Sequence, residues 1–258
     1  MSGVAGAWRI ADIGGHPAEI YDPPEVKHPH SAVMYLHGVK LGKLTDKPEY
    51  LRRFDEAGMR VIAPHTERSW WTDKICPEFD PKLTAERYLL DHVLPWLQAE
   101  MNVKPGLTAL LGISMGGQGA LRLAFKYPRL FPIAAAISPA IDYWRYFEIF
   151  STLPEMYSDP EAARQDSAIL HLHPLNWPRH LWFCCDPNDV DWGESSERLQ
   201  MKLASLGIPH TCDLETEAGG HHWRYYNAMA GPAFHFILER LQQETQRLDA
   251  ISSEESSL

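Results

Sequence analysis

Short apolar segments alternate with longer segments of helical periodicity along most of this chain. The apolar segments predict buried strands, and the periodic segments predict helices that pack against them. Strands are predicted within residues 31–38, 59–65, 109–113, 132–138, 181–185 and 210–216, and helices within residues 47–58, 82–101, 194–206 and 223–248 and from residue 115 onward. This alternation implies right-handed crossovers and an α/β fold, with a mostly parallel sheet that has helices on both faces.

The alternation stops between Pro139 and Pro178. This segment contains several prolines and the aromatic run "DYWRYFEIF", and it is too long for an ordinary connection. We expect a small, cap-like helical excursion over the sheet. With 258 residues and 45% hydrophobic content, residues 1–248 are expected to form one domain. The acidic, serine-rich residues 249–258 predict a disordered tail.

A serine flanked by glycines interrupts the apolar core. The predicted strand 109–113 ends in Gly112-Ile113-Ser114-Met115-Gly116, and a helical pattern follows at once. A chain that turns from strand to helix in so few residues places the central residue in a strained conformation, and flanking side chains would collide there. We therefore expect Ser114 to stand exposed on a tight turn, with Gly112 and Gly116 leaving the crowded positions empty.

The other predicted strands also end in loops with reactive side chains. Ligands of parallel sheets collect at the carboxyl ends of the strands, where this chain carries "LHGVK", "CCDPNDVDW" and "EAGGHHW". A serine nucleophile needs a histidine base, and the base needs an acid behind it. The chain supplies them in the order Ser, Asp, His, which is the order found in α/β-hydrolases. The candidate acids are Asp186, Asp189 and Asp191, and the candidate bases are His221 and His222.

The stretch "GISMGGQGALRLAFKYP", together with "LHG" and "GGHHW", resembles the putative-esterase branch of the α/β-hydrolases over residues 33–236. That branch includes S-formylglutathione hydrolases, feruloyl and enterochelin esterases, and mycolyltransferases. Its histidine lies in Gly-x-His-x-Trp, so the resemblance implies His221 as the base. Its acid commonly lies in Gly-x-x-Asp, which favours Asp189. Because Asp186 replaces that glycine, Asp186 and Asp191 stay open as alternatives.

An oxyanion hole would be built from main-chain N–H groups. The residue after the nucleophile, Met115, supplies one donor by position. The resemblance implies Val39 as the second donor. The alternative is that "HGVK" is only the loop by which the chain leaves the strand. We expect a serine esterase that acylates Ser114 and then hydrolyses the acyl-enzyme, with His221 changing from base to acid and without a cofactor. The alternatives are an acyltransferase and a non-catalytic binding protein on the same scaffold.

Two other groups of residues were weighed as site candidates. Trp70, Trp71, Tyr143 and Trp144, with the neighbouring Tyr146 and Phe147, form either a substrate pocket or packing between the excursion and the core. Histidine pairs at residues 28/30 and 171/173 have no carboxylate or cysteine nearby to complete a metal site, so no metal is expected.

Charge and cysteine usage narrow the class of protein. A net charge of −10 and a pI near 5.7 argue against nucleic acid as a partner. The chain has no apolar run long enough to span a membrane and no signal-like start, so we expect a cytoplasmic protein with a small ester substrate. The four cysteines lack C-x-x-C spacing and are expected to be reduced thiols in or near the core. The oligomeric state is open, with a homo-oligomer as one alternative.

Overall fold

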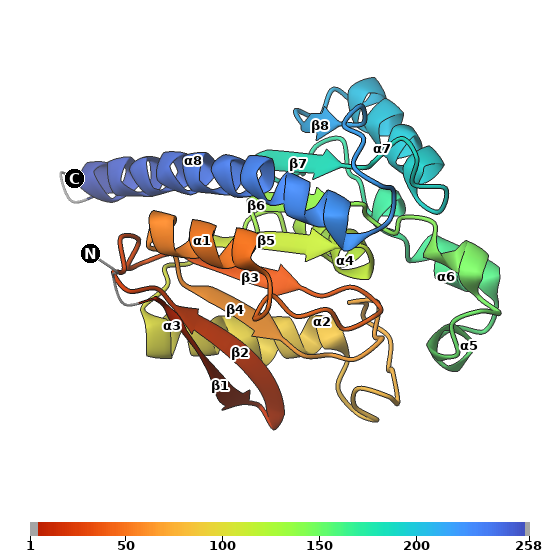
Figure 1. Cartoon of the computed structure of the whole chain (residues 1–258), viewed down its shortest axis with the longest axis horizontal. Helices are drawn as coiled ribbons and strands as arrows, with labels where there is room; N and C mark the ends of the chain where they lie inside the picture. Colours follow the sequence, from red (N-terminus) through yellow and green to blue (C-terminus); the bar gives the residue numbers. More distant parts are fainter. Residues whose placement is uncertain (1–4, 256–258) are drawn as a thin grey trace.

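A single mixed sheet forms the centre of the computed structural model, which describes residues 5–255. Within this part of the chain the sheet has eight strands in the order β1-β2-β4-β3-β5-β6-β7-β8 (Figure 1). Strands β3 to β8 run parallel, whereas β1 and β2 are antiparallel to their neighbours, so the predicted mostly parallel sheet is confirmed. The strands are β1 (Ala7–Ile13), β2 (His16–Asp22), β3 (Ala32–Leu36), β4 (Val61–Pro64), β5 (Thr108–Ile113), β6 (Ile133–Ile137), β7 (His180–Cys184) and β8 (Thr211–Asp213).

Helices cover both faces of the sheet, as the alternation of strands and helices in the sequence predicts. One face carries α2 (Ala85–Tyr88), the π-helical turn η1 (Leu89–Val93), α3 (Leu94–Met101), α4 (Met115–Lys126) and α7 (Gly193–Ser205), and the other carries α1 (Pro48–Ala57) and α8 (Trp223–Glu255). The adjacent thiols of Cys184 and Cys185 pack into opposite core layers, in agreement with strand alternation. All four cysteines are free.

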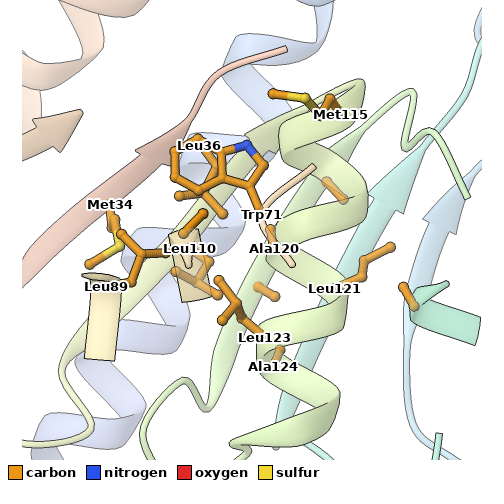
Figure 2. Packing of buried hydrophobic residues seen from close by; sticks show 14 of the residues in the cluster. Met34, Leu36, Trp71, Leu89, Leu110, Met115, Ala120, Leu121, Leu123 and Ala124 are labelled. Atoms are coloured by element: carbon orange, nitrogen blue, oxygen red, sulfur yellow. The ribbon is translucent and has the colours of Figure 1, made fainter. Parts of the chain in front are cut away.

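Helix α4 is the best-packed helix of the first face. Its residues 115–125 are all buried, and Leu121, Leu123 and Ala124 share one core layer with Leu110 of β5 (Figure 2). Close packing along the whole helix leaves little freedom at its first turn. The residue that precedes α4, Ser114, therefore has a fixed position above the end of β5.

The first two strands were not predicted from the sequence. They form a hairpin whose two connecting residues, Gly14 and Gly15, have φ of 60° and 87°, values that glycine adopts without strain. β1 lies at the edge of the sheet, and its central Ile10 is 73% exposed. Because most of its side chains face solvent, β1 lacks the alternation that marks a half-buried strand.

The segment 139–178 leaves the sheet as a series of short helices. These are η2 (Tyr143–Tyr146), α5 (Thr152–Met156), α6 (Pro160–Gln165) and η3 (Ala168–Leu170). In Figure 1, α5 and α6 extend beyond the carboxyl ends of the strands. The excursion begins close to the Ser114 turn, because Ala140 N donates a 3.0 Å hydrogen bond to Ser114 O.

The C-terminal helix corrects one expectation. α8 continues to Glu255, whereas residues 249–258 were predicted to be disordered. Two serines of this segment bond to the helix backbone: Ser252 Oγ donates to Leu248 O, and Ser253 Oγ donates to Ala250 O. Residues 256–258 lie outside the described part of the chain. In residues 5–255 no helix, α8 included, combines the length and apolar content that crossing a membrane requires.

Candidate active site

Ser114 sits on a strained turn between β5 and α4. Its backbone has φ 58° and ψ −117°, a region that side-chain-bearing residues rarely occupy. The flanking glycines are required by contact: a Cβ on Gly112 would lie 2.0 Å from Gly116 O, and a Cβ on Gly116 would lie 1.8 Å from Leu36 O. The turn therefore has the geometry that the glycine spacing predicts. Ser114 is only 6% exposed, however, because its hydroxyl faces the loop that carries His221 and is covered by it.

His221 lies directly opposite this hydroxyl. Its Nε2 is 3.0 Å from Ser114 Oγ, and its side chain is 23% exposed. The loop between β8 and α8 places it there, with Gly219 and Gly220 at φ of 104° and 68°. The neighbouring His222 is exposed, and its Nδ1 accepts a hydrogen bond from Arg224 N. Of the two candidate bases, only His221 therefore reaches Ser114.

Asp189 completes a hydrogen-bonded chain behind the histidine. Its Oδ2 is 2.8 Å from His221 Nδ1 and 3.6 Å from Cys185 Sγ. Its Oδ1 accepts hydrogen bonds from the backbone N–H groups of Asp191 and Trp192, at the start of α7. The carboxylate is buried and held on both oxygens, so it keeps one orientation toward the imidazole.

The other two candidate acids have different partners. The Asp186 carboxylate is buried and accepts hydrogen bonds from Ala218 N, Gly220 N and Asn188 N. Burial raises the pKa of Asp186, but these backbone donors outweigh burial and lower the pKa below its usual value. Asp186 thus joins the loop after β7 to the loop that carries His221. Asp191 instead accepts a 2.6 Å hydrogen bond from Tyr146 of the excursion.

The proposed oxyanion donors flank the serine on two sides. Met115 N is the first N–H of α4, where the positive end of the helix dipole lies. Val39 follows Gly38, whose Cα faces the serine closely enough that an added Cβ would lie 3.3 Å from Ser114 Cβ. In the described part of the chain neither N–H donates to another group. Both main-chain donors are therefore unoccupied beside Ser114.

His37 supports the backbone on the Val39 side. Its ring is buried, Nδ1 is 3.1 Å from Gly38 O, and Nε2 accepts a hydrogen bond from Thr66 N. Burial lowers the pKa of His37 to about 4, and a weaker contribution comes from the neighbouring His65. The ring is therefore neutral at pH 7, and its two hydrogen bonds hold the backbone at Gly38 in place.

The aromatic residues that were weighed as a substrate pocket differ in burial. Trp70, Trp71 and Tyr143 are 0–1% exposed, and Trp70 stacks on Tyr143 with ring centroids 4.8 Å apart. Trp70 and Tyr143 join the excursion to the core, and Trp71 packs against His37, so the burial of these three side chains favours packing over substrate contact. Trp144 differs, because it is half-buried and lines a cavity of about 400 Å³ with Asp142 and other residues of the excursion and α7.

Polar residues on the buried face of α4 hold the excursion, and the sequence analysis missed them. Gln118 Nε2 donates to Trp70 O, and Gln118 Oε1 accepts from Ala168 N, each at 3.0 Å. Four residues later, Arg122 contacts Glu86 and Asp166. The sequence does contain a sign of these contacts, because polar residues recur four and eight positions after Ser114 in an otherwise apolar helix.

The Arg122 contacts form a buried ionic network. The Arg122 and Glu86 side chains are 0–1% exposed, and Glu86 also binds Lys126 and Tyr127. Burial raises the pKa of Glu86, but its cationic and hydroxyl partners together keep it below its usual value. Burial also raises the pKa of Asp166, but hydrogen bonds and charge from His171 and Arg122 outweigh it and lower this pKa to about 2. The network therefore stays charged and joins α2, α4 and the excursion.

The histidine pairs weighed as metal sites have separate partners. His171 Nε2 lies 3.1 Å from Asp166 Oδ1, whereas His173 Nδ1 accepts from Leu175 N. His30 Nδ1 bonds Asn102 O. Among residues 5–255 no three histidine, cysteine or acidic side chains are gathered as a metal ion would require.

Residues 17–230 match the family model described as putative esterase. Over 63 residues the chain is 43% identical to diacylglycerol acyltransferase/mycolyltransferase Ag85C of Mycobacterium leprae, and this match covers 23% of the chain and 19% of that protein. Over 94 residues it is 33% identical to Ag85A of Mycobacterium tuberculosis, covering 34% of the chain and 28% of that protein. The chain thus matches less than a third of the length of either relative.

Solved structures resemble the whole fold. An S-formylglutathione hydrolase from Agrobacterium tumefaciens has a TM-score of 0.72 and 19% identity, with 92% of this chain and 94% of that chain covered. The fluorophosphonate-binding serine hydrolase F of Staphylococcus aureus has a TM-score of 0.69 and 17% identity, with 91% and 99% covered. At these identities the likeness concerns the fold, which is that of the α/β-hydrolases.

Proposed function

Since the chain belongs to the putative esterase family, we propose that it hydrolyses carboxylic esters or thioesters of small molecules through an acyl-enzyme on Ser114. The observation that carries the proposal is the hydrogen-bonded chain Ser114 Oγ–His221–Asp189, with links of 3.0 and 2.8 Å. Each link is within the distance at which a proton passes between side chains. The strained turn supports the same role, because it directs the hydroxyl toward the His221 imidazole.

The proposed reaction has two halves. In the first, His221 Nε2 takes the Ser114 proton as Oγ attacks the carbonyl carbon, and the protonated imidazole then gives that proton to the leaving alcohol or thiol. In the second, His221 takes a proton from water, hydroxide attacks the acyl carbon, and Ser114 regains its proton as the acid leaves. Asp189 keeps the Nδ1 proton in place and stabilises the imidazolium in both halves.

Negative charge develops on the carbonyl oxygen in both transition states. Val39 N–H and Met115 N–H are the proposed donors to it, and both are free to donate. A main-chain donor that is already fixed needs no reorganisation during the reaction, which is why such donors lower the barrier. Their proposed role depends on backbone position alone, so the side chains of Val39 and Met115 do not enter it.

Ester hydrolysis is preferred over acyl transfer. The matches to diacylglycerol acyltransferase/mycolyltransferases are short and span less than a third of those proteins, whereas the esterase family match spans most of this chain. A cytoplasmic location belongs to the proposal, and four free thiols support a reducing compartment.

The proposal is tested with a panel of p-nitrophenyl esters of increasing acyl length, together with thioesters that include S-formylglutathione. Wild-type protein should release p-nitrophenol, whereas Ser114→Ala should not. Release that is equal in both proteins would reject the proposal. Adding a series of alcohols as acceptors separates the two activities, since transfer would yield new esters at the expense of the free acid.

A further inference from the structure

A second groove lies at the end of the molecule opposite to Ser114. Three arginines, Arg129, Arg179 and Arg247, line a cavity of about 590 Å³ at the N-terminal ends of β6 and β7. Helix α4 separates this end from Ser114, and its twelve residues span about 18 Å. The groove is therefore distinct from the candidate active site.

A shared buried carboxylate holds two of these arginines side by side. Glu244 is 2% exposed and binds Arg247 at 2.8 Å and Arg179 at 3.6 Å. It also contacts His180, whose pKa is lowered by burial. Two guanidinium groups repel one another, so a common buried anion fixes them close together before any ligand arrives.

The arginines retain donors and excess positive charge. The third guanidinium, on Arg129, forms no ion pair among the residues that the structure describes. Three guanidinium charges face the single carboxylate of Glu244, so these four groups carry a net charge of +2 in a chain whose net charge is −10. Guanidinium N–H groups left unpaired in a groove match the oxygens of a phosphate or carboxylate.

The rest of the groove is lined by apolar side chains and Asn176. Leu175 is 85% exposed and Trp177 is 36% exposed, whereas Pro128 and Pro132 are buried beneath the groove. A short turn presents Leu175, because its N–H donates to His173 Nδ1 and residues 173 and 176 form a β-bridge. A large exposed side chain beside an excess of positive charge marks a surface that binds a ligand with one charged and one apolar part.

We propose that this groove binds a small organic anion with a flat apolar body. Its phosphate or carboxylate group contacts the guanidinium groups of Arg129 and Arg247, and its body packs against Trp177 and Leu175. Arg179 contributes charge beside the Glu244 carboxylate. The site takes its ligand independently of Ser114, and binding there does not require ester cleavage.

The test uses calorimetry with 1-naphthyl phosphate, which carries both parts of the proposed ligand. Wild-type protein should bind it one to one, at least tenfold more tightly than 1-naphthol or inorganic phosphate. Arg129→Gln should weaken binding at least fivefold, and Arg129→Lys should weaken it less. Trp177→Ala should also weaken it, whereas Arg52→Gln, on the exposed face of α1, should have no effect. Protein labelled with a fluorophosphonate should bind as wild type does.

Three results would overturn the proposal. The first is no binding of 1-naphthyl phosphate at millimolar concentration, or equal binding of the neutral naphthol. The second is equal affinity of Arg129→Gln and Arg52→Gln. The third is loss of binding after fluorophosphonate labelling, which would place the ligand at Ser114. Ester hydrolysis by Arg129→Gln should equal that of wild type, so failure of this site is distinguishable from failure of the proposed function.

Discussion

Asp186 and Asp189, three residues apart in one loop, act on the same histidine in different ways. Asp189 Oδ2 accepts directly from His221 Nδ1 at 2.8 Å, whereas Asp186 Oδ2 accepts from Ala218 N and Gly220 N in the loop that carries His221. One carboxylate faces the imidazole, and the other holds the backbone from which the imidazole projects. Substitutions at the two positions should therefore separate turnover from stability.

Asp189→Asn should lower kcat by about 10⁴-fold with little change in KM, because the amide favours the wrong tautomer of His221 and cannot stabilise its protonated form. Asp186→Asn should instead lower the free energy of unfolding by about 1–3 kcal/mol. The reason is that the amide replaces one of the two oxygens to which backbone N–H groups donate in the folded chain. Steady-state kinetics and urea unfolding at pH 7.5 measure both. Asp191→Asn, which loses only a contact with Tyr146, is the matched control for turnover. An inactive Asp186→Asn beside an active Asp189→Asn would reverse the assignment.

Trp144 and Tyr143 are adjacent but differ in burial, and their variants should differ accordingly. Trp144→Ala should change the ratio of kcat/KM between short and bulky acyl esters at least fivefold, with a small change in Tm, because Trp144 is a half-buried residue of the cap-like excursion that begins beside Ser114. The cavity that Trp144 lines includes neither Ser114 nor His221, so the prediction rests on the excursion and not on that cavity. Tyr143→Ala should lower the free energy of unfolding by about 3–5 kcal/mol, the range for removing a buried aromatic ring. If Trp144→Ala lowers kcat/KM equally for all esters, and the loss follows the fall in Tm, then Trp144 has only a packing role.

The Ser114 turn, the loop position of His221 and the helical pattern could be predicted because each depends on local sequence. Gly112 and Gly116 are required by atoms within the same turn and in the adjacent strand, so their spacing alone indicates the geometry of Ser114. The choice among three nearby aspartates depends on which carboxylate the fold turns toward His221, and a loop sequence does not specify that direction. The β1–β2 hairpin was missed because exposure at the sheet edge removes the alternation on which strand prediction depends.

Long-range polar contacts were the least predictable part. Arg122 is separated from Glu86 by 36 residues and from Asp166 by 44 residues, and only the folded chain brings the three together. The aromatic cluster was ambiguous for a similar reason, since "WW" and "DYWRYF" are equally suited to a pocket wall and to a packed interface. Burial in the folded chain assigns Trp70, Trp71 and Tyr143 to packing.

Arg122→Met should lower the free energy of unfolding by about 3–5 kcal/mol, because it leaves the buried Glu86 without its main cationic partner. Arg87→Met breaks an ion pair with Asp91 whose side chains are 48% and 43% exposed, so it should lower the free energy of unfolding far less than Arg122→Met does. Chemical unfolding compares the two. Adding Glu86→Gln to Arg122→Met should recover part of the loss, and a double variant less stable than the single one would contradict the network.

The buried His37 should make stability depend on pH. Its pKa falls to about 4 in the folded chain, mainly through burial, against about 6.5 when unfolded. Between these values the unfolded chain binds a proton that the folded chain does not, so acidification from pH 6.5 to 4 destabilises the fold by up to roughly 1.4 kcal/mol per pH unit from this group. His37→Asn should reduce the slope of unfolding free energy against pH in this window. His235→Asn, at an exposed position, is the control, and equal slopes in the two variants would contradict the assignment.

The central claim is that the acyl group is carried on Ser114. Wild-type protein mixed with a p-nitrophenyl ester and quenched in acid within the first turnover should gain the mass of one acyl group, and peptide mapping should locate it on Ser114. Ser114→Ala should gain none while unfolding cooperatively. An acyl group found on another residue, or p-nitrophenol release by Ser114→Ala at the wild-type rate, would contradict the account.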